Sequence, residues 1–200
     1  MANQYFENDP GLEHEVKNFN FTLRDHNFDF MSDSGVFSRQ TVDYGSRVLI
    51  EAIDFQDIPA GNILDVGCGY GPIGLSLAKE QDKRQVTMVD VNLRALDLAK
   101  KNADNNQIKN VEIFESDTYK DVKGKFALIV SNPPVRAGKN VVNSILADSK
   151  DYLEPNGELW IVLQKKQGAP SAKKLMDQTF GNVDVVVRDK GYYILRSKLI

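Results

Sequence analysis

Residues 65–74 have the sequence DVGCGYGPIG, in which three glycines alternate with other residues directly before a proline. Because glycine has no Cβ, such a turn lets the backbone come close to a bound molecule. Pro72 suits the first turn of a helix, where a backbone N–H has no helical partner. The free N–H groups at such a helix start face the ligand. The stretch therefore predicts a strand, a ligand-binding turn and a helix, in that order.

Two kinds of cofactor fit this turn. Residues 69–74 match the G-x-G-x-x-G fingerprint of dinucleotide binding. The glycines begin earlier, however, and Asp65 stands at the end of the strand before them, which resembles the first motif of S-adenosylmethionine (SAM) methyltransferases. A carboxylate at this place suits the ammonium group of an amino acid and repels a pyrophosphate. The charge argument favours SAM, and a turn that only packs the core is the remaining alternative.

From residue 62 onward, strand-like and helix-like segments alternate. The strand-like runs are Asn62–Val66, Val86–Asp90, Val111–Glu115, Phe126–Ser131, Glu158–Leu163, Val183–Arg188 and Tyr192–Ser197, and the helix-like segments are Pro72–Gln81, Leu93–Asn105, Asn140–Leu153 and Ala172–Phe180. This alternation predicts an α/β fold, a mostly parallel sheet with helices on both faces. Only three residues separate the last two strands, which predicts a C-terminal antiparallel hairpin. Seven strands ending this way resemble the Rossmann-like layout of class I methyltransferases.

The N-terminal part of the chain follows another pattern. Between residues 18 and 31, phenylalanines alternate with polar residues on both sides of Asp25-His26-Asn27, which predicts a small β-hairpin. From residue 41, apolar residues at helical spacing predict a helix that ends before Pro59. We therefore divide the chain into an N-terminal extension, residues 1–40, and a cofactor-binding domain, residues 41–200.

Acidic residues follow the next two predicted strands. Asp90 ends the second strand, where a carboxylate accepts hydrogen bonds from both hydroxyls of a ribose. This position does not separate the dinucleotide from SAM. Asp117 follows the third strand, where an acidic residue of SAM enzymes commonly binds the adenine amino group. An aspartate in a turn is common by itself, but Asp117 is in register with Asp65 and Asp90.

The fourth strand ends in Ser131-Asn132-Pro133-Pro134, at the edge of a parallel sheet where ligands bind. Methylation of an exocyclic or amide nitrogen needs such a stiff site, because the lone pair of that nitrogen is delocalised and must be aimed at the methyl group. Two acceptors for the amine hydrogens, the Asn132 side-chain oxygen and the Pro133 carbonyl, would aim it and stabilise the positive charge that develops. The alternative is a turn that only ends the strand.

Together, the glycine stretch and the Asn-Pro-Pro motif resemble the small-domain group of class I SAM-dependent methyltransferases, whose best-known members methylate guanine N2 in 16S ribosomal RNA. The segment GVFSR, residues 35–39, is similar to a family stretch at the cofactor end of the pocket. The resemblance implies Asn132, Pro133 and Pro134 as catalytic residues. It implies that SAM is bound by Phe37, Asp65, Gly67, Gly69, Gly71, Asp90, Val91, Asp117, Thr118 and Asn132.

The chain departs from this family pattern at one position. Many Asn-Pro-Pro enzymes place an aromatic residue after the prolines, where it stacks on the target, but Val135 stands here. Phe37 is then the first candidate for stacking. Arg136 and Lys139 follow, where they would hold a phosphate of nucleic acid; a basic helix start without a ligand is the alternative. Val135, Arg136, Lys139 and Phe37 are the predicted substrate-binding residues.

Composition excludes several other classes of protein. Two hundred residues suffice for one domain with a large core. The single cysteine excludes an intrachain disulfide and a cysteine-based zinc cluster, and both histidines lie within the first 26 residues, so that no metal site is expected. The N-terminus lacks the pattern of a signal peptide, and no apolar run is long enough to span a membrane. The expected location is the cytoplasm.

Charge is distributed unevenly along the chain. The net charge is −3, yet residues 119–200 carry 14 basic and 8 acidic side chains. A basic part of this size would attract a polyanion such as RNA, although a solvated surface explains most of these lysines as well.

The sequence thus predicts SAM-dependent methyl transfer to an exocyclic amine of an RNA base. The resemblance alone favours guanine N2 in small-subunit ribosomal RNA, since the same Asn-Pro-Pro geometry serves adenine N6 or a protein glutamine amide. A SAM-binding scaffold without turnover is the alternative from another class, but it leaves Asn132 and the prolines unexplained. An NAD-dependent enzyme leaves both Asp65 and the Asn-Pro-Pro motif unexplained. The pattern does not choose between a monomer and a dimer.

Overall fold

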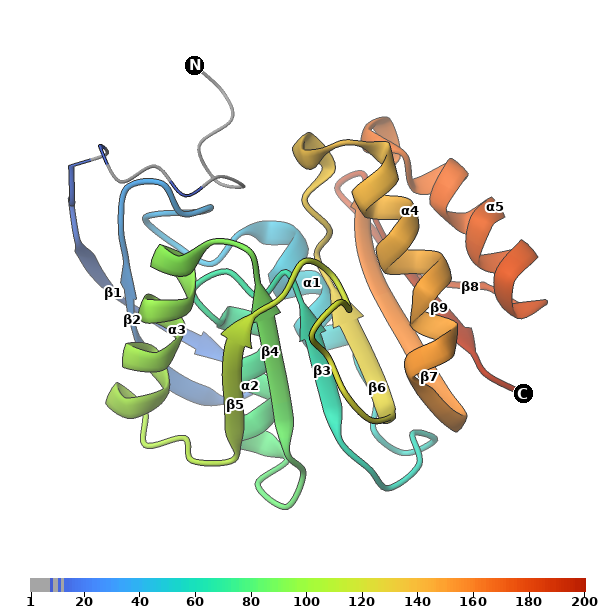
Figure 1. Ribbon diagram of the computed structural model, residues 1–200, viewed down its shortest axis with the longest axis horizontal. Helices are drawn as coiled ribbons and strands as arrows, with labels where there is room; N and C mark the ends of the chain where they lie inside the picture. The colour runs from blue at the N-terminus through green and yellow to red at the C-terminus, as the bar shows by residue number, and fades with distance from the viewer. Residues whose placement is uncertain (1–7, 9–10, 12) are drawn as a thin grey trace.

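A computed structural model describes residue 8, residue 11 and residues 13–200 of the chain. Its main sheet contains β3 (Ile63–Val66), β4 (Val86–Asp90), β5 (Val111–Glu115), β6 (Phe126–Ser131), β7 (Leu153–Gln164), β8 (Asp184–Asp189) and β9 (Tyr192–Lys198). Their order is β5-β4-β3-β6-β7-β9-β8, as drawn in Figure 1. The strands from β5 through β7 are parallel, and β9 runs antiparallel to β7 and β8. The predicted class I methyltransferase fold is confirmed.

Helices cover both faces of this sheet (Figure 1). They are α1 (Tyr44–Ala52), α2 (Pro72–Glu80), α3 (Leu93–Asn105), α4 (Lys139–Asp148) and α5 (Ala169–Phe180). Because successive side chains of a strand point to opposite faces, the strands of the main sheet contribute side chains to two hydrophobic clusters, one on each face. On β6, Leu128 and Val130 belong to the cluster with α1, α2 and α3, while Ile129 belongs to the cluster with α4 and α5. Burial on both faces explains why the central strands β3, β4 and β6 are largely apolar.

The predicted N-terminal hairpin is present as β1 (Lys17–Leu23) and β2 (His26–Ser32). Phe28 and Phe30 are fully buried and belong to the same cluster as α1, α2 and α3. The hairpin therefore packs as an outer layer on these helices. The division of the chain into an N-terminal extension and a cofactor-binding domain at residue 40 stays a prediction.

Asn102 of α3 and Asn106, the C-cap of that helix, bind the edge of β2 as a neighbouring strand would. Asn102 accepts a hydrogen bond from the Met31 N–H at 2.7 Å and donates to the Met31 carbonyl at 3.0 Å. Asn106, one helical turn later, makes the same pair of bonds with the backbone of Asp29. Asn102 also donates to the Tyr70 carbonyl at 2.9 Å, so that one buried side chain joins the hairpin to the glycine turn.

Helix boundaries near the end of β6 differ from the prediction. The helix expected over Asn140–Leu153 begins at Lys139, ends at Asp148 and continues as a 3₁₀ turn, η2 (Ser149–Tyr152). Leu153 already begins β7, which is longer than the predicted strand. The sequence Pro155-Asn156-Gly157 is typical of a turn, but here it forms an irregular part of β7, with Asn156 at φ +64° and a register shift against β6.

We expect Asn102→Ala to lower the free energy of unfolding by about 2–4 kcal/mol, because it leaves buried backbone groups of Met31 and Tyr70 without partners. Urea denaturation measures this change. Asn105→Ala, on the exposed side of the same helix, is the matched control and should change stability by less than about 1 kcal/mol. Equal losses in the two variants would contradict the role given to Asn102.

Candidate active site

The predicted site residues gather at the edge of the sheet where the parallel strands end, which is the upper edge in Figure 1. The glycine turn follows β3, Asp90 ends β4, and Asn132 follows β6. Two hydrogen bonds bring the strand ends together. Ser131 Oγ donates to the Val66 carbonyl at 2.6 Å, and the Ser116 N–H donates to the Asp90 carbonyl at 3.1 Å.

The glycine turn has the backbone conformation that its composition predicts. Gly67, Gly69 and Gly71 have φ values of +75°, +58° and +103°, which side-chain-bearing residues rarely adopt. A Cβ on Gly71 would lie 2.8 Å from Leu75 Cδ1, so packing also excludes one there. A Cβ on Gly69 would have no atom within 4 Å, so this glycine borders open space. The turn therefore offers bare backbone to a ligand.

Asp65 lies beneath the turn and is completely buried. Its Oδ2 accepts a hydrogen bond from the Gly74 N–H at 2.8 Å, while Oδ1 has no hydrogen-bond partner among the described residues. Burial raises the pKa of this carboxyl to about 7, with a smaller contribution from the charge of Asp90. Oδ1 is thus an unsatisfied acceptor next to the turn, which fits a cationic ligand and opposes an anionic one.

Asp90 links the turn to two further segments. Its Oδ2 accepts from the Gly69 N–H at 2.8 Å, and its Oδ1 accepts from the Asn92 N–H at 2.9 Å. Asn92 in turn donates to the Gly35 carbonyl at 2.9 Å, which brings the segment with Phe37 to this edge. Burial raises the pKa of Asp90. Each carboxylate oxygen keeps acceptor capacity for a further donor.

Asn132 is held through its amide nitrogen. Nδ2 donates to Asp43 Oδ2 and to Ser46 Oγ, each at 3.0 Å, and both partners belong to the start of α1. Among the described residues, none donates to Asn132 Oδ1 or to the Pro133 carbonyl. The two acceptors that the sequence analysis assigned to an amine, on half-buried Asn132 and buried Pro133, are therefore both without a donor in this part of the chain.

The remaining predicted residues lie around this centre. A Cβ on Gly67 would lie 3.9 Å from Pro134 Cδ, so the glycine turn and the Asn-Pro-Pro motif are neighbours. Asp117 is exposed and Thr118 half-buried after β5, and Val91 follows Asp90. Phe37 is 52% exposed. Val135 begins a 3₁₀ turn, η1 (Val135–Ala137), and Arg136 and Lys139 are exposed beside it.

Sequence analysis missed three residues at this edge. Asp43 and Ser46 hold Asn132, although they stand nearly 90 positions before it in the chain. Asn8 donates to the Val91 carbonyl at 3.2 Å and accepts from the Leu93 N–H at 2.9 Å. The only available signal was the spacing of Asp43 and Ser46, which is typical of a helix N-cap; nothing in it points to Asn132.

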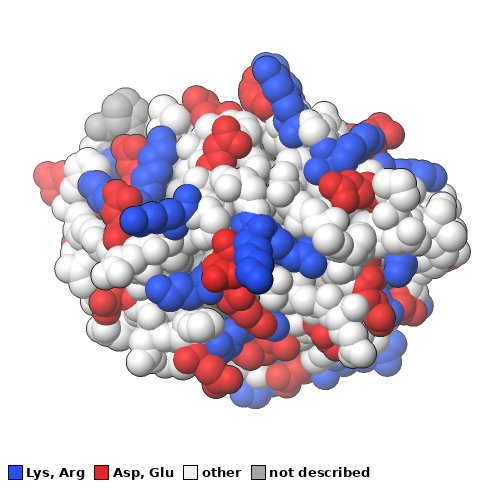
Figure 2. All heavy atoms as spheres, turned by 90° about the horizontal axis from the view of Figure 1, so that it is seen from below, with Lys and Arg blue, Asp and Glu red and all other residues white. Residues whose placement is uncertain are grey.

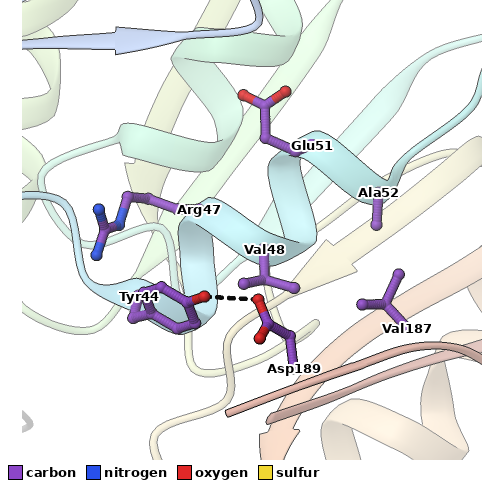
Figure 3. A pocket seen from close by; sticks show the side chains of 7 residues that line it. All are labelled: Tyr44, Arg47, Val48, Glu51, Ala52, Val187 and Asp189. Atoms are coloured by element: carbon purple, nitrogen blue, oxygen red, sulfur yellow. Dashed lines mark hydrogen bonds between the residues drawn. The ribbon is translucent and has the colours of Figure 1, made fainter.

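A separate hollow of about 380 Å³ lies between α1 and β8. Figure 3 shows its lining, with Tyr44 Oη donating to Asp189 Oδ2 at 2.5 Å. The Arg47 guanidinium stacks on the Tyr44 ring at 4.9 Å. These contacts fasten the first turn of α1 to β8, on the helix that also holds Asn132.

The described part of the chain holds neither a cluster of metal-ligating side chains nor a long apolar helix. No group of three or more His, Cys, Asp or Glu side chains there is placed to hold a metal ion. Among the same residues, no helix has both the length and the apolar character needed to cross a membrane.

Comparison with known proteins assigns the chain to a family. Residues 27–196 match the model of the methyltransferase small domain. The chain is 48% identical to the uncharacterized protein YbxB of Bacillus subtilis over the full length of both. It is 35% identical to ribosomal RNA small subunit methyltransferase C of Haemophilus influenzae, over 92% of this chain and 56% of that protein.

Among solved structures, the chain resembles the T. thermophilus 16S rRNA N2 G1207 methyltransferase RsmC in complex with AdoMet and guanosine. The TM-score is 0.83 at 24% identity, over 94% of this chain and 52% of that one. This likeness shows the fold. The chain thus spans about half the length of these ribosomal RNA methyltransferases and the whole length of YbxB.

The buried carboxyl of Asp65 predicts a pH-dependent cost to stability. Its folded pKa of about 7 lies above the unfolded value, so the cost is absent below pH 4, grows as pH rises, and is complete above pH 7. At pH 8 we expect Asp65→Asn to raise the free energy of unfolding by about 2–4 kcal/mol. Urea denaturation at pH 8 and pH 4.5 measures the gain, which should shrink at the lower pH. A gain that is equal at both pH values would refute the assignment.

Proposed function

The chain belongs to the family of methyltransferase small domains, and on that premise we propose that it methylates guanine N2 in small-subunit ribosomal RNA. It is a SAM-dependent methyltransferase. One observation carries the proposal furthest: Asn132 Oδ1 and the Pro133 carbonyl are two unused acceptors on a rigid strand end. An amine with two hydrogens matches this pair.

The residues at the glycine turn fit SAM. Gly69 borders open space where a ligand can lie against the backbone. Asp90 keeps acceptor capacity for ribose hydroxyls, and the unpartnered Oδ1 of Asp65 favours the cationic methionine end over a pyrophosphate. Because Asp65 is buried, it would act through its charge, which is fully present only above about pH 7. Val91, Asp117 and Thr118 are proposed for the adenine end, and Phe37 for the rim.

The chain's own groups then position the acceptor nitrogen. SAM, when bound, supplies an electrophilic methyl group on a sulfonium. Asn132 Oδ1 and the Pro133 carbonyl accept the two amine hydrogens, which aims the nitrogen lone pair and stabilises the positive charge that forms on it. Pro133 and Pro134 restrict the backbone, so that the carbonyl keeps its direction. Neither acceptor titrates near neutral pH, so the released proton passes to water.

Two observations favour RNA over a protein glutamine. Exposed Arg136 and Lys139 follow the Asn-Pro-Pro motif in the chain. Their positive charges suit the phosphates next to a nucleotide that is rotated out of its stack. Phe37, 52% exposed, offers a ring for that base in place of the aromatic residue missing at Val135. The opposite edge of the molecule, seen in Figure 2, shows acidic and basic side chains interspersed.

Transfer of tritiated methyl from SAM tests the function directly. Unmodified ribosomal RNA, small ribosomal subunits, DNA and a protein extract are offered separately, and we expect label in RNA or subunits at guanine N2. Asn132→Ala should lower this turnover by about 10²-fold or more while the Kd of SAM changes little. Label only in protein would replace the proposal with glutamine methylation, and label only in DNA would replace RNA as the substrate.

A second measurement tests whether Arg136 and Lys139 bind RNA. We expect Arg136→Ala with Lys139→Ala to weaken RNA binding and to reduce the slope of log K against log salt by about 1–2, since each side chain is assigned one phosphate. Lys100→Ala with Lys101→Ala, an exposed pair on α3, is the matched control with equal loss of charge. A slope that falls equally in both double variants would show that the effect is general charge and not this site.

A further inference from the structure

We propose that Asp43, assisted by Ser46, is a positioning residue that fixes the amide of Asn132 with Oδ1 toward the methyl acceptor. The inference rests on the proposed function in one respect, because it takes Asn132 Oδ1 as the group that accepts from the target amine. It adds a residue from the start of α1 to a reaction otherwise assigned to the ends of β3, β4 and β6.

The contacts define one orientation of the amide. Asn132 Nδ2 has two hydrogens, and the structure supplies one acceptor for each, Asp43 Oδ2 and Ser46 Oγ at 3.0 Å. A carboxylate can only accept hydrogen bonds. Rotating the amide by 180° would place Asn132 Oδ1 against Asp43 Oδ2, exchanging a charge-assisted hydrogen bond for repulsion between two oxygens. Asp43 therefore selects the rotamer that leaves Oδ1 available.

Asp43 is itself firmly placed. The same Oδ2 accepts the Ser46 N–H at 2.9 Å, which makes Asp43 the N-cap of α1, and its carbonyl accepts the Arg47 N–H at 3.1 Å. The adjacent Tyr44 donates to Asp189 (Figure 3). Lys190 Nζ lies 4.6 Å from the centre of the Tyr44 ring. The first turn of α1, which contains Tyr44, is thus docked on the β8–β9 hairpin.

The chemical consequence concerns the target nitrogen. A free amide side chain exposes oxygen and nitrogen in two orientations, and only one of them can accept from an amine. Holding that orientation before the substrate arrives removes a reorganisation step from the barrier. The effect therefore belongs to kcat, and the Kd of SAM should be unaffected by it.

A helix cap alone would also explain Asp43, and two substitutions separate the roles. Asp43→Ser keeps a good N-cap for the Ser46 N–H, but its shorter side chain does not reach Asn132. Asp43→Asn keeps an oxygen that can accept from both Ser46 N and Asn132 Nδ2, as one oxygen does now. Tyr44→Phe is the matched control, since it removes a bond of the same helical turn that does not involve Asn132.

The test is steady-state methyl transfer with the full chain, using the acceptor that the wild type labels. We expect Asp43→Ser to lower kcat by about ten- to a hundredfold, with KM and the Kd of SAM within about twofold, and Asp43→Asn to recover most of kcat. In the background of Asn132→Ala, Asp43→Ser should cause no further loss, because it acts through that side chain. Wild-type kcat in Asp43→Ser, full additivity with Asn132→Ala, or an Asp43→Asn variant as slow as Asp43→Ser would each overturn the proposal.

A readout without substrate keeps this inference apart from the proposed function. In ¹⁵N-labelled protein, the side-chain amide signals of Asn132, assigned by their loss in Asn132→Ala, should move and exchange faster with water in Asp43→Ser but not in Tyr44→Phe. Unchanged signals in Asp43→Ser would refute the positioning contact even if the wild type methylates RNA. Shifted signals in a protein that labels only glutamine would keep Asp43 as the positioning residue and reject the RNA substrate.

Discussion

Two carboxylates hold the glycine turn, and the rest of the site is arranged around them. Asp65 on β3 accepts the Gly74 N–H, and Asp90 on β4 accepts the Gly69 N–H. Since neighbouring parallel strands end at the same edge, one bond fixes the middle of the turn and the other fixes the start of α2 directly after it. The cost is a fully buried acid with one unsatisfied oxygen, which burial keeps at a raised pKa. A buried polar atom without a partner is uncommon in folded proteins and is more often found at functional sites.

Hydrogen bonds from three side chains connect the glycine turn, Asp90 and Asn132 to segments that are distant in the sequence. Asn102 connects the glycine turn to the N-terminal hairpin, and Asn92 connects Asp90 to the segment that contains Phe37. Asp43 connects α1 to Asn132. Each of these side chains binds two or more partners, so its removal leaves several polar groups unpaired. The hairpin therefore supports the glycine turn, and α1 supports Asn132, although neither element belongs to the parallel strands.

The groups after β3 and β4 differ in charge and chemistry from the groups after β6. Groups at the ends of β3 and β4 present backbone and negative charge, which suits a cationic cofactor. Groups after β6 present two neutral acceptors, which suit an amine that becomes positive during transfer. Two exposed basic side chains, Arg136 and Lys139, stand next to this second group, where an anionic substrate would lie. The groups proposed for cofactor and for substrate thus lie along one edge of the sheet.

Local patterns were enough to predict the parallel sheet, its terminal hairpin, the glycine turn and the Asn-Pro-Pro strand end, because each depends on neighbouring residues and a period of two or 3.6. The same reasoning placed the end of the helix after Asn140 wrongly, since the sheet absorbs Pro155-Asn156-Gly157 into β7. Asp43 gave only the pattern of a helix cap. Its contact with Asn132, the burial of Asp65 and the pairing of Asn102 with β2 join residues far apart in the chain. Such contacts arise only when the strands and helices pack, because no local preference encodes which distant group a polar side chain will meet.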